Sequence, residues 1–241
     1  MKKYLLLIII TNVSCNYINS DQKKEEFTLQ LGDMLFQDLD SSPLCNAIEL
    51  VTPGYKGANL SHVGIIVEEK TPFCTNSDSR FENKYFYNIE QEVKVLEALP
   101  GGVKTVILDS FLNRSFDNNN MPKVIVGRLK KKYQYAIADG IQFLNSKIGK
   151  DYDDYFLMQN EKYYCSELIH DAFASDSIFK MSPMTFINPN TNETMDIWKE
   201  YYNKLNIKIP EGQLGINPGI MSISEKIEIV HIYGIPEGMK R

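Results

Sequence analysis

The chain has 241 residues, which is enough for one well-packed core and does not require a second domain. Hydrophobic residues make up 43% of the chain and charged residues 24%, as in an ordinary soluble globular protein. The net charge is −5 and the basic residues are scattered, which argues against a nucleic-acid partner, because such proteins usually carry a basic stripe.

The N-terminus has the features of a secretory signal. A basic start precedes a short apolar run, Tyr4 to Ile10, and small and polar residues then lead to Cys15. The run is far shorter than the roughly 20 apolar residues that a membrane-spanning helix needs. Ser14-Cys15 resembles the end of a bacterial lipoprotein signal, in which the cysteine is lipidated; a plain signal cleaved somewhat later is the alternative. We therefore predict a signal peptide over residues 1–15, lipidation of Cys15, and an exported protein anchored to the membrane in the periplasm or cell envelope.

From residue 16 onward the pattern predicts a tether and then one folded domain. Residues 16–26 are polar and charged, and residues 27–241 have the pattern of a single α+β domain. A turn at Gly32 leads into a short buried strand that ends near Phe36. Ser42 and Pro43 predict the start of a helix, because Ser favours the N-cap and Pro the first turn. This helix is expected to end before Pro53-Gly54.

The middle of the chain predicts an antiparallel sheet. Short β-rich runs follow one another without helices between them, over residues 61–67, 85–88, 93–98, 103–108 and 123–129. Apolar residues at helical spacing then predict a helix over 133–148 that ends at Gly149. A second helix is predicted over 163–173, a polar helix over 196–205 and a last strand over 227–230.

Cys165 is a candidate nucleophile because it falls near the start of a predicted helix. Unpaired backbone N–H groups and the positive end of the helix dipole both favour the thiolate, which is the nucleophilic form. A buried structural cysteine is the alternative interpretation.

His62 and Glu97 are candidate partners for that thiol. His62 shares one face of its strand with Gly64 and Ile66, which suggests a ring that reaches into a cleft, although a half-exposed histidine at a strand end fits equally well. Glu97 shares a face with Val95 and is costly to bury without a partner. A histidine on a neighbouring strand is a natural partner, and a glutamate that reaches solvent is the alternative.

No cofactor and no metal site are expected. The chain has no Cys-x-x-Cys motif, and its three histidines lie far apart in sequence. His170 follows Cys165 by five residues and points to another helix face, and His231 has no nearby partner. A disulfide between Cys45 and Cys74 is compatible with an oxidising periplasm, but the sequence does not decide it.

Several short segments occur in an order that resembles a known family. They are Gly32 to Phe36, Ser61 to Ile65, Leu96 to Ala98 followed by Gly102-Val103, Gly149 to Asp153, and Tyr164 to Ile169. The late segment Asn217 to Val230 extends the match, which covers about residues 31–230. This ordered set resembles the YiiX/YaeF-like family of permuted, papain-like NlpC-type cysteine peptidases and amidases.

The resemblance implies a circularly permuted papain-like (NlpC-type) α+β fold, in which an antiparallel sheet packs against the helix that carries the nucleophile. Carried over onto this chain, it makes Cys165 the nucleophile, His62 the base and Glu97 the residue that orients the base. It places the Cys165 backbone N–H in the oxyanion hole. Tyr164 and Tyr152 are expected to line the substrate-binding cleft. The stretch 74–90 is longer than the usual hairpin of the family.

The signal and the resemblance together predict an exported cysteine hydrolase. Its substrate is expected to be a cell-wall peptide amide or a small acyl-amide, cleaved through a thioester on Cys165. One alternative is a lipid-directed acyltransferase or thioesterase, which a long apolar groove beside Cys165 would favour, whereas a polar, tyrosine-lined cleft would favour peptides. Another alternative is a catalytically silent binding module at the envelope surface.

Overall fold

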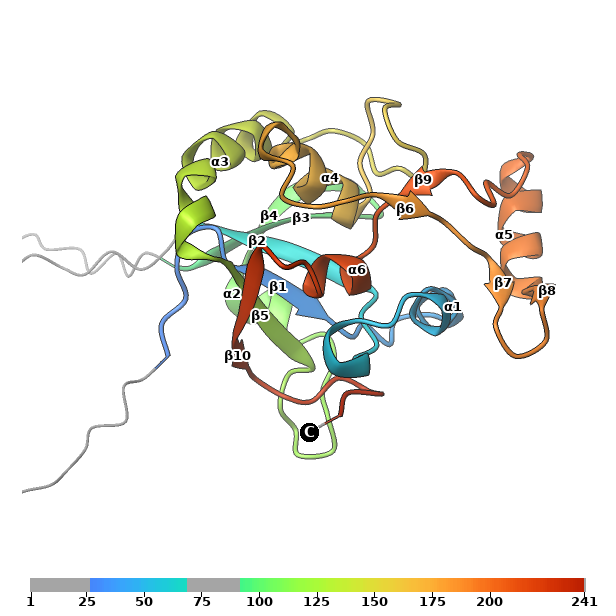
Figure 1. Cartoon of the computed structure of the whole chain (residues 1–241), viewed down its shortest axis with the longest axis horizontal. Coiled ribbons are helices and arrows are strands. Elements are labelled where there is room, and N and C mark those ends of the chain that lie inside the picture. The colour runs from blue at the N-terminus through green and yellow to red at the C-terminus, as the bar shows by residue number, and fades with distance from the viewer. Residues whose placement is uncertain (1–26, 69–91, 241) are drawn as a thin grey trace, which may run out of the picture.

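A six-stranded antiparallel sheet forms the centre of the computed structural model, which describes residues 27–68 and 92–240 (Figure 1). The strand order is β10-β5-β1-β2-β3-β4, and every neighbouring pair is antiparallel. The strands are β1 (Met34–Gln37), β2 (His62–Glu68), β3 (Lys94–Leu99), β4 (Gly102–Ile107), β5 (Val124–Leu129) and β10 (Ile227–Ile232). The predicted antiparallel sheet is therefore confirmed, while the strand predicted over 85–88 lies outside the described residues.

Six α-helices surround this sheet in the part of the chain that the structure describes. They are α1 (Pro43–Val51), α2 (Leu108–Leu112), α3 (Ile137–Ser146), α4 (Cys165–Ala172), α5 (Asp196–Leu205) and α6 (Pro218–Ser222). Short 3-10 turns are η1 (Tyr55–Gly57), η2 (Lys131–Ala136) and η3 (Ala174–Asp176). Two small ladders pair β6 (Ser182–Pro183) with β9 (Leu214–Gly215) and β7 (Ile187–Asn188) with β8 (Glu193–Thr194). No helix within residues 27–68 and 92–240 is long and apolar enough to cross a membrane.

One helix prediction and one strand prediction need correction. The helix predicted over 133–148 begins as the 3-10 turn η2 and becomes an α-helix only from Ile137 to Ser146. Such tighter turns are common at helix N-termini, and hydrophobic spacing does not distinguish them from an α-helical turn. The run predicted as strand through residue 108 instead turns into α2 at Leu108. A helix of five residues is too short to show a 3.6-residue period.

Both faces of the sheet are covered, because alternate strand residues point to opposite sides. On one face, Val63 and Ile65 of β2 pack with Leu168 and Ile169 of α4, and α3 lies beside α4 (Figure 1). On the other face, Ile66 packs with residues of α2. Burial on both sides explains why β2 is apolar along most of its length.

Gly64 makes room for α2 beside His62. A Cβ atom at position 64 would lie 2.7 Å from Cε2 of Phe111 and 2.6 Å from Cγ1 of Val95. The sequence suggested that this glycine opens space next to the histidine, and the ring of Phe111 fills that space. The aromatic ring then stacks on His62, with ring centroids 5.6 Å apart.

A third apolar cluster lies to the side of the sheet. Trp198 and Tyr202 of α5 pack with Phe186 and with Ala47 of α1. In Figure 1, α5 and the β7–β8 hairpin lie at the right, away from the sheet and beyond α1. The helix predicted as polar over 196–205 therefore has one aromatic face, and this face is buried against α1.

Candidate active site

Cys165 is the first residue of α4, and the local sequence explains why the helix begins there. Tyr164 occupies the N-cap position in an extended conformation. Glu167, in the first helical turn, accepts hydrogen bonds from the backbone N–H groups of Tyr164 and Gln159. A Glu side chain that binds back to the N-cap residue is the second half of a capping box. Burial, with the charges of Asp171 and Asp153, raises the pKa of Glu167 from 4.5 to about 8. The Cys165 side chain is buried except where it lines a cleft.

His62 and Glu97 meet where β2 begins and β3 ends. The antiparallel pairing places these two strand ends side by side, and Nε2 of His62 lies 2.7 Å from Oε2 of Glu97. Ile66 pairs with Val95, so His62 and Glu97 lie on the same face of the sheet, as the alternation predicted. Both side chains are buried. The expected contact between these two residues is therefore present.

The thiol of Cys165 completes the cluster. Cys165 lies close enough to His62 to interact with its ring and to raise the pKa of the ring. Because Nε2 is bound to Glu97, the other ring nitrogen, Nδ1, remains for the thiol. The structure thus brings together the three residues for which the resemblance implied a catalytic role.

The ionisation of this cluster is set by opposing effects. Burial disfavours a charged His62 ring and lowers its pKa, but the interactions with Cys165 and Glu97 outweigh burial and raise the pKa of His62 from 6.5 to about 9. Burial also opposes ionisation of Glu97, yet hydrogen bonds from Arg114 and His62 lower the pKa of Glu97 from 4.5 to about 2. At neutral pH, Glu97 is a carboxylate beside a protonated imidazole.

Arg114 is a member of the site that the sequence did not reveal. Its Nη1 donates to Oε2 of Glu97 at 2.6 Å and its Nη2 donates to Oε1 at 2.5 Å. The guanidinium also lies over the ring of Phe111, with Cζ 5.1 Å from the centroid. A two-point contact fixes both the position and the plane of a carboxylate. Arg114 follows α2 in a loop and has no local pattern that could have signalled this contact.

Replacing Arg114 with Gln is expected to lower kcat by about 10- to 100-fold with little change in KM, because a loosely held Glu97 misorients the His62 ring. Steady-state kinetics on an accepted amide substrate measures this. Arg128→Gln is a matched control, since Arg128 holds the buried Asp33 through a similar two-point contact away from the cluster. An equal loss of kcat in both variants would indicate a general effect on the fold and would contradict a positioning role for Arg114.

The two tyrosines predicted to line the cleft have different surroundings. The Tyr164 hydroxyl accepts a hydrogen bond from the Ile216 N–H and donates one to Sδ of Met158, so this side chain also ties the walls of the site together. Tyr152 is held by an isolated bridge to Tyr163 and lines the cleft with Cys165. Burial, with the negative charge of Cys165, raises the pKa of Tyr152 well above 10, so its phenol stays protonated and can donate a hydrogen bond.

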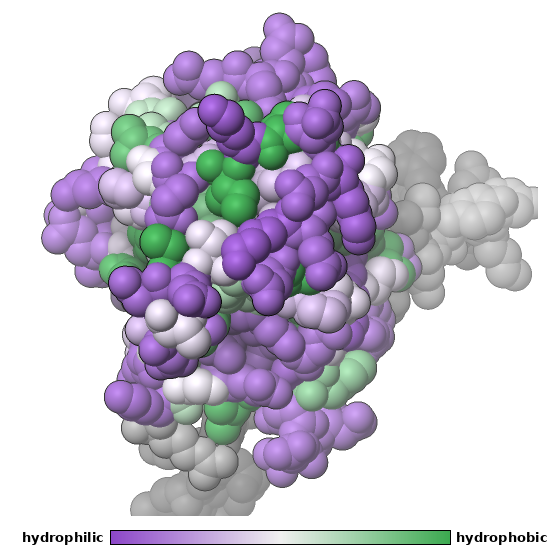
Figure 2. All heavy atoms as spheres, turned by 90° about the vertical axis from the view of Figure 1, so that its right-hand side faces the viewer, coloured by the Kyte–Doolittle hydropathy of each residue, from purple (hydrophilic) through white to green (hydrophobic). Residues whose placement is uncertain are grey.

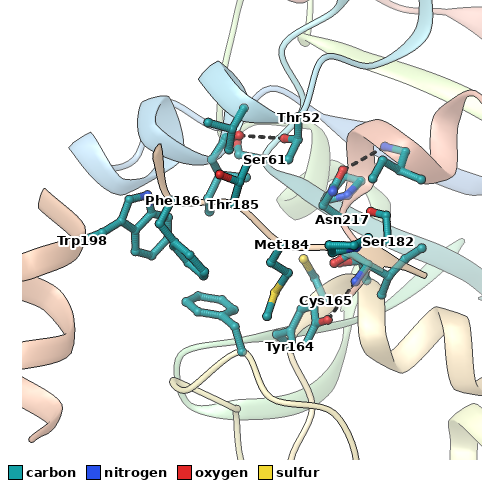
Figure 3. A pocket seen from close by; sticks show the side chains of 18 of the residues that line it. Thr52, Ser61, Tyr164, Cys165, Ser182, Met184, Thr185, Phe186, Trp198 and Asn217 are labelled. Atoms are coloured by element: carbon teal, nitrogen blue, oxygen red, sulfur yellow. Dashed lines mark hydrogen bonds between the residues drawn. The ribbon is translucent and has the colours of Figure 1, made fainter. Parts of the chain in front are cut away.

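The cleft beside Cys165 has a volume of about 760 Å³, including space open to solvent. Its walls come from α1, the start of α4, the segment 182–186, α5 and the segment 216–220. In Figure 3, Cys165, Tyr164 and Ser182 lie at one end, Trp198 and Phe186 at the other, and Met184 between them. On the side of the molecule that carries α5, Figure 2 shows hydrophobic residues exposed within a hydrophilic surround.

The remaining candidates lie away from this cluster or outside the described residues. Cys15, the signal over 1–15, the tether over 16–26 and the stretch 74–90 fall outside them. Cys45 is buried on α1 with its thiol near the hydroxyls of Ser41 and Ser42, and Cys74 lies outside the described residues. His170 binds its neighbour Asp171, and His231 stacks on Phe27.

Comparison with known proteins places this geometry in context. One family model matches residues 28–231 of the chain. The family is described as permuted papain-like amidase enzyme, YaeF/YiiX, C92 family. A crystal structure of yiiX from Escherichia coli O157:H7 superposes with a TM-score of 0.62 and 20% identity, over 86% of this chain and 99% of that one. At 20% sequence identity, the similarity between the two structures shows that the two proteins share a fold. A search of curated proteins gave no significant match.

These comparisons and the observed sheet confirm the predicted permuted papain-like α+β fold. The E. coli protein is described as a metalloprotein. Within residues 27–68 and 92–240 of the present chain, no three His, Cys, Asp or Glu side chains are grouped so that they could hold a metal ion.

Proposed function

Because this chain belongs to the YaeF/YiiX, C92 family of permuted papain-like amidase enzymes, we propose that it hydrolyses an amide with Cys165 as nucleophile, His62 as acid and base, and Glu97 as the residue that orients His62. The observation that carries this assignment is the buried His62 ring, whose Nε2 is bound to Glu97 and whose pKa is raised by Cys165 and by Glu97. A nucleophile, a base and an orienting carboxylate in hydrogen-bond contact have the geometry of covalent acyl transfer.

In the first half of the reaction, the Cys165 thiolate attacks the carbonyl carbon of the amide and a carbon–sulfur bond forms. The negative charge that develops on the carbonyl oxygen is stabilised by the Cys165 backbone N–H at the start of α4. The protonated phenol of Tyr152, in the same cleft, is a second donor for this charge. The carbon–nitrogen bond then breaks, the nitrogen takes a proton from His62, and an amine leaves.

In the second half, water releases the acyl group from sulfur. Neutral His62 now removes a proton from a water molecule, whose oxygen attacks the thioester carbonyl. The carbon–sulfur bond breaks, a carboxylic acid is released, and the thiolate and protonated His62 are restored. Glu97, fixed by Arg114, holds the ring in place and stabilises its positive charge throughout.

The location and substrates form a second part of the proposal. The N-terminal sequence supports export to the periplasm or cell envelope, with a membrane anchor through lipidated Cys15 and a tether over 16–26. An enzyme at that location would meet cell-wall peptides and small acyl-amides, and we propose that its substrate belongs to one of these two classes. Labelling of cells with a radioactive fatty acid tests the anchor: wild-type protein should carry the label and Cys15→Ala should not.

The activated pair is tested by alkylating the purified protein with iodoacetamide. A protonated imidazole next to the sulfur favours the reactive thiolate. We expect Cys165 in the wild-type protein to react at pH 6–7 at least tenfold faster than in His62→Ala, as measured by peptide mass spectrometry. Cys45, which lies away from His62, serves as an internal reference in both proteins. Equal rates for Cys165 with and without His62 would refute the proposed pair.

A further inference from the structure

The lining of the cleft points to the acyl part of the substrate. We propose that the enzyme hydrolyses amides of fatty acids, with an unbranched hydrocarbon chain of the acyl group bound along the cleft that starts at Cys165. This inference rests on the proposed function, because it takes Cys165 as the nucleophile. It also makes use of the alternative left open by the sequence, in which a long apolar groove beside Cys165 would indicate a lipid-directed enzyme.

Carbon atoms dominate the walls away from the thiol. The apolar lining comes from four separate parts of the chain and includes Ile48, Val51, Met184, Phe186, Trp198 and Ile216. Among the described residues that line the cleft, none is Asp, Glu, Lys, Arg or His. A charged peptide segment buried here would lose its hydration without gaining an ionic partner, whereas a hydrocarbon chain loses nothing by leaving water.

Five polar side chains of the lining are already hydrogen-bonded within the protein. Thr52 donates to the Ile48 carbonyl at 2.7 Å, and Ser166 donates to the Ile216 carbonyl at 3.0 Å. Three more behave alike: Ser61 accepts from the Leu39 N–H, Tyr164 from the Ile216 N–H, and Asn217 from the Ile220 N–H. The indole N–H of Trp198, at the far end of the cleft, has no partner within the described residues. Figure 3 shows the contacts of Thr52, Tyr164 and Asn217 as dashed lines. These side chains are thus poorly placed to recognise the amide groups of a peptide.

The cleft suits the acyl group better than the amine. The acyl group stays on Cys165 while the amine departs and water enters, so contacts with the acyl chain hold the intermediate in place through both halves of the reaction. The released amine becomes a cation in water, and the described lining has no carboxylate to bind it. The elongated arrangement from Cys165 past Met184 to Phe186 and Trp198 fits a linear chain (Figure 3).

The test is the dependence of kcat/KM on acyl length, measured with the full chain on p-nitroanilides of acetic, butyric, hexanoic and octanoic acid. Each methylene moved from water into an apolar wall favours binding about fourfold, so octanoyl should exceed acetyl by about 10³-fold. N-octanoylglycine should also be cleaved faster than N-octylacetamide, in which the chain is on the amine. Faster cleavage of N-octylacetamide would overturn the proposal.

A substitution in α1 tests where the acyl chain of the substrate binds. Val51→Asp places a carboxylate in the lining and should lower the ratio of kcat/KM for the octanoyl substrate to kcat/KM for the acetyl substrate at least tenfold. Leu50→Asp is the matched control, because Leu50 is the neighbouring residue on α1, is 42% exposed and does not line the cleft. Equal rates for all acyl lengths, with an acetyl group still transferred to Cys165, would refute the acyl-chain proposal alone. Absence of any acyl group on Cys165 from every substrate would instead refute the proposed function.

Discussion

Replacing Cys165 with Ala is expected to lower kcat for amide hydrolysis by about 10⁴-fold or more. The substitution removes only the sulfur, which lies at the start of α4 in contact with His62 and is the one atom that can form the thioester. His62 and the oxyanion donors act through that covalent step, so their contributions are lost together with it. Steady-state kinetics on an acyl p-nitroanilide measures the loss.

Cys45→Ala provides the control for this prediction. Cys45 is the other free cysteine in residues 27–68 and 92–240, and it is buried on α1 beside two serine hydroxyls, without contact with His62. Its replacement should leave kcat within about twofold of the wild-type value. The stability of the fold should fall because the packing of the removed sulfur is lost. If Cys165→Ala retained turnover comparable to that of Cys45→Ala, another residue would have to be the nucleophile.

The second large effect is expected for Glu97→Gln. A neutral amide keeps the shape of the carboxylate but removes the charge that stabilises protonated His62 and that Arg114 binds at two points. A change of this kind in the orienting residue of a catalytic triad lowers kcat by up to about 10⁴-fold, and we expect a fall of about 10²- to 10⁴-fold here.

The pH profile distinguishes this mechanism from a loss of folding. His62 must be protonated to donate to the leaving amine, and its pKa is raised from 6.5 to about 9, so wild-type activity should be present below about pH 9 and lost as the pH rises through that value. In Glu97→Gln, one of the interactions that raise the pKa of His62 is gone. The loss of activity on the alkaline side of the pH profile, the alkaline limb, should therefore occur at lower pH. Asp33→Asn, which also removes a buried carboxylate paired with an arginine, should leave the limb in place. An unchanged limb in Glu97→Gln would contradict the role of Glu97.

The sequence predicted the main strands and helices well where the pattern is local. The alternation of β2 fixed which face carries His62, and the register of Ile66 with Val95 placed Glu97 on that same face. Capping and proline signals located α1 within one residue of its observed start, and residues 196–205 were predicted as a helix, although as a polar one without the buried aromatic face of α5. A period-2 or period-3.6 pattern predicts an orientation relative to the core. For His62 and Glu97 it left an exposed strand-end position open, and the resemblance to the family was needed to imply that the two residues act together.

The rest of the site depends on contacts between distant segments. Arg114 reaches Glu97 from a loop after α2, and neither that short helix nor the side chain has a periodic signal. The apolar character of the cleft arises because residues as far apart as Ile48, Met184, Trp198 and Ile216 converge on Cys165. The sequence contained these residues, but it did not indicate which side of each segment would face the thiol. The sequence therefore left the substrate class open between peptides and lipids, and the proposed binding of an acyl chain rests on the walls that these residues form.

The most direct test of the proposed reaction is the location of the acyl group during turnover. The full-length protein is mixed with p-nitrophenyl octanoate, quenched in acid within the first turnover, digested, and analysed by mass spectrometry. We predict an octanoyl group on the peptide that contains Cys165, which disappears as hydrolysis proceeds and does not form in Cys165→Ala. An octanoyl group on any other residue, or turnover that proceeds without acylation of Cys165, would contradict the proposal.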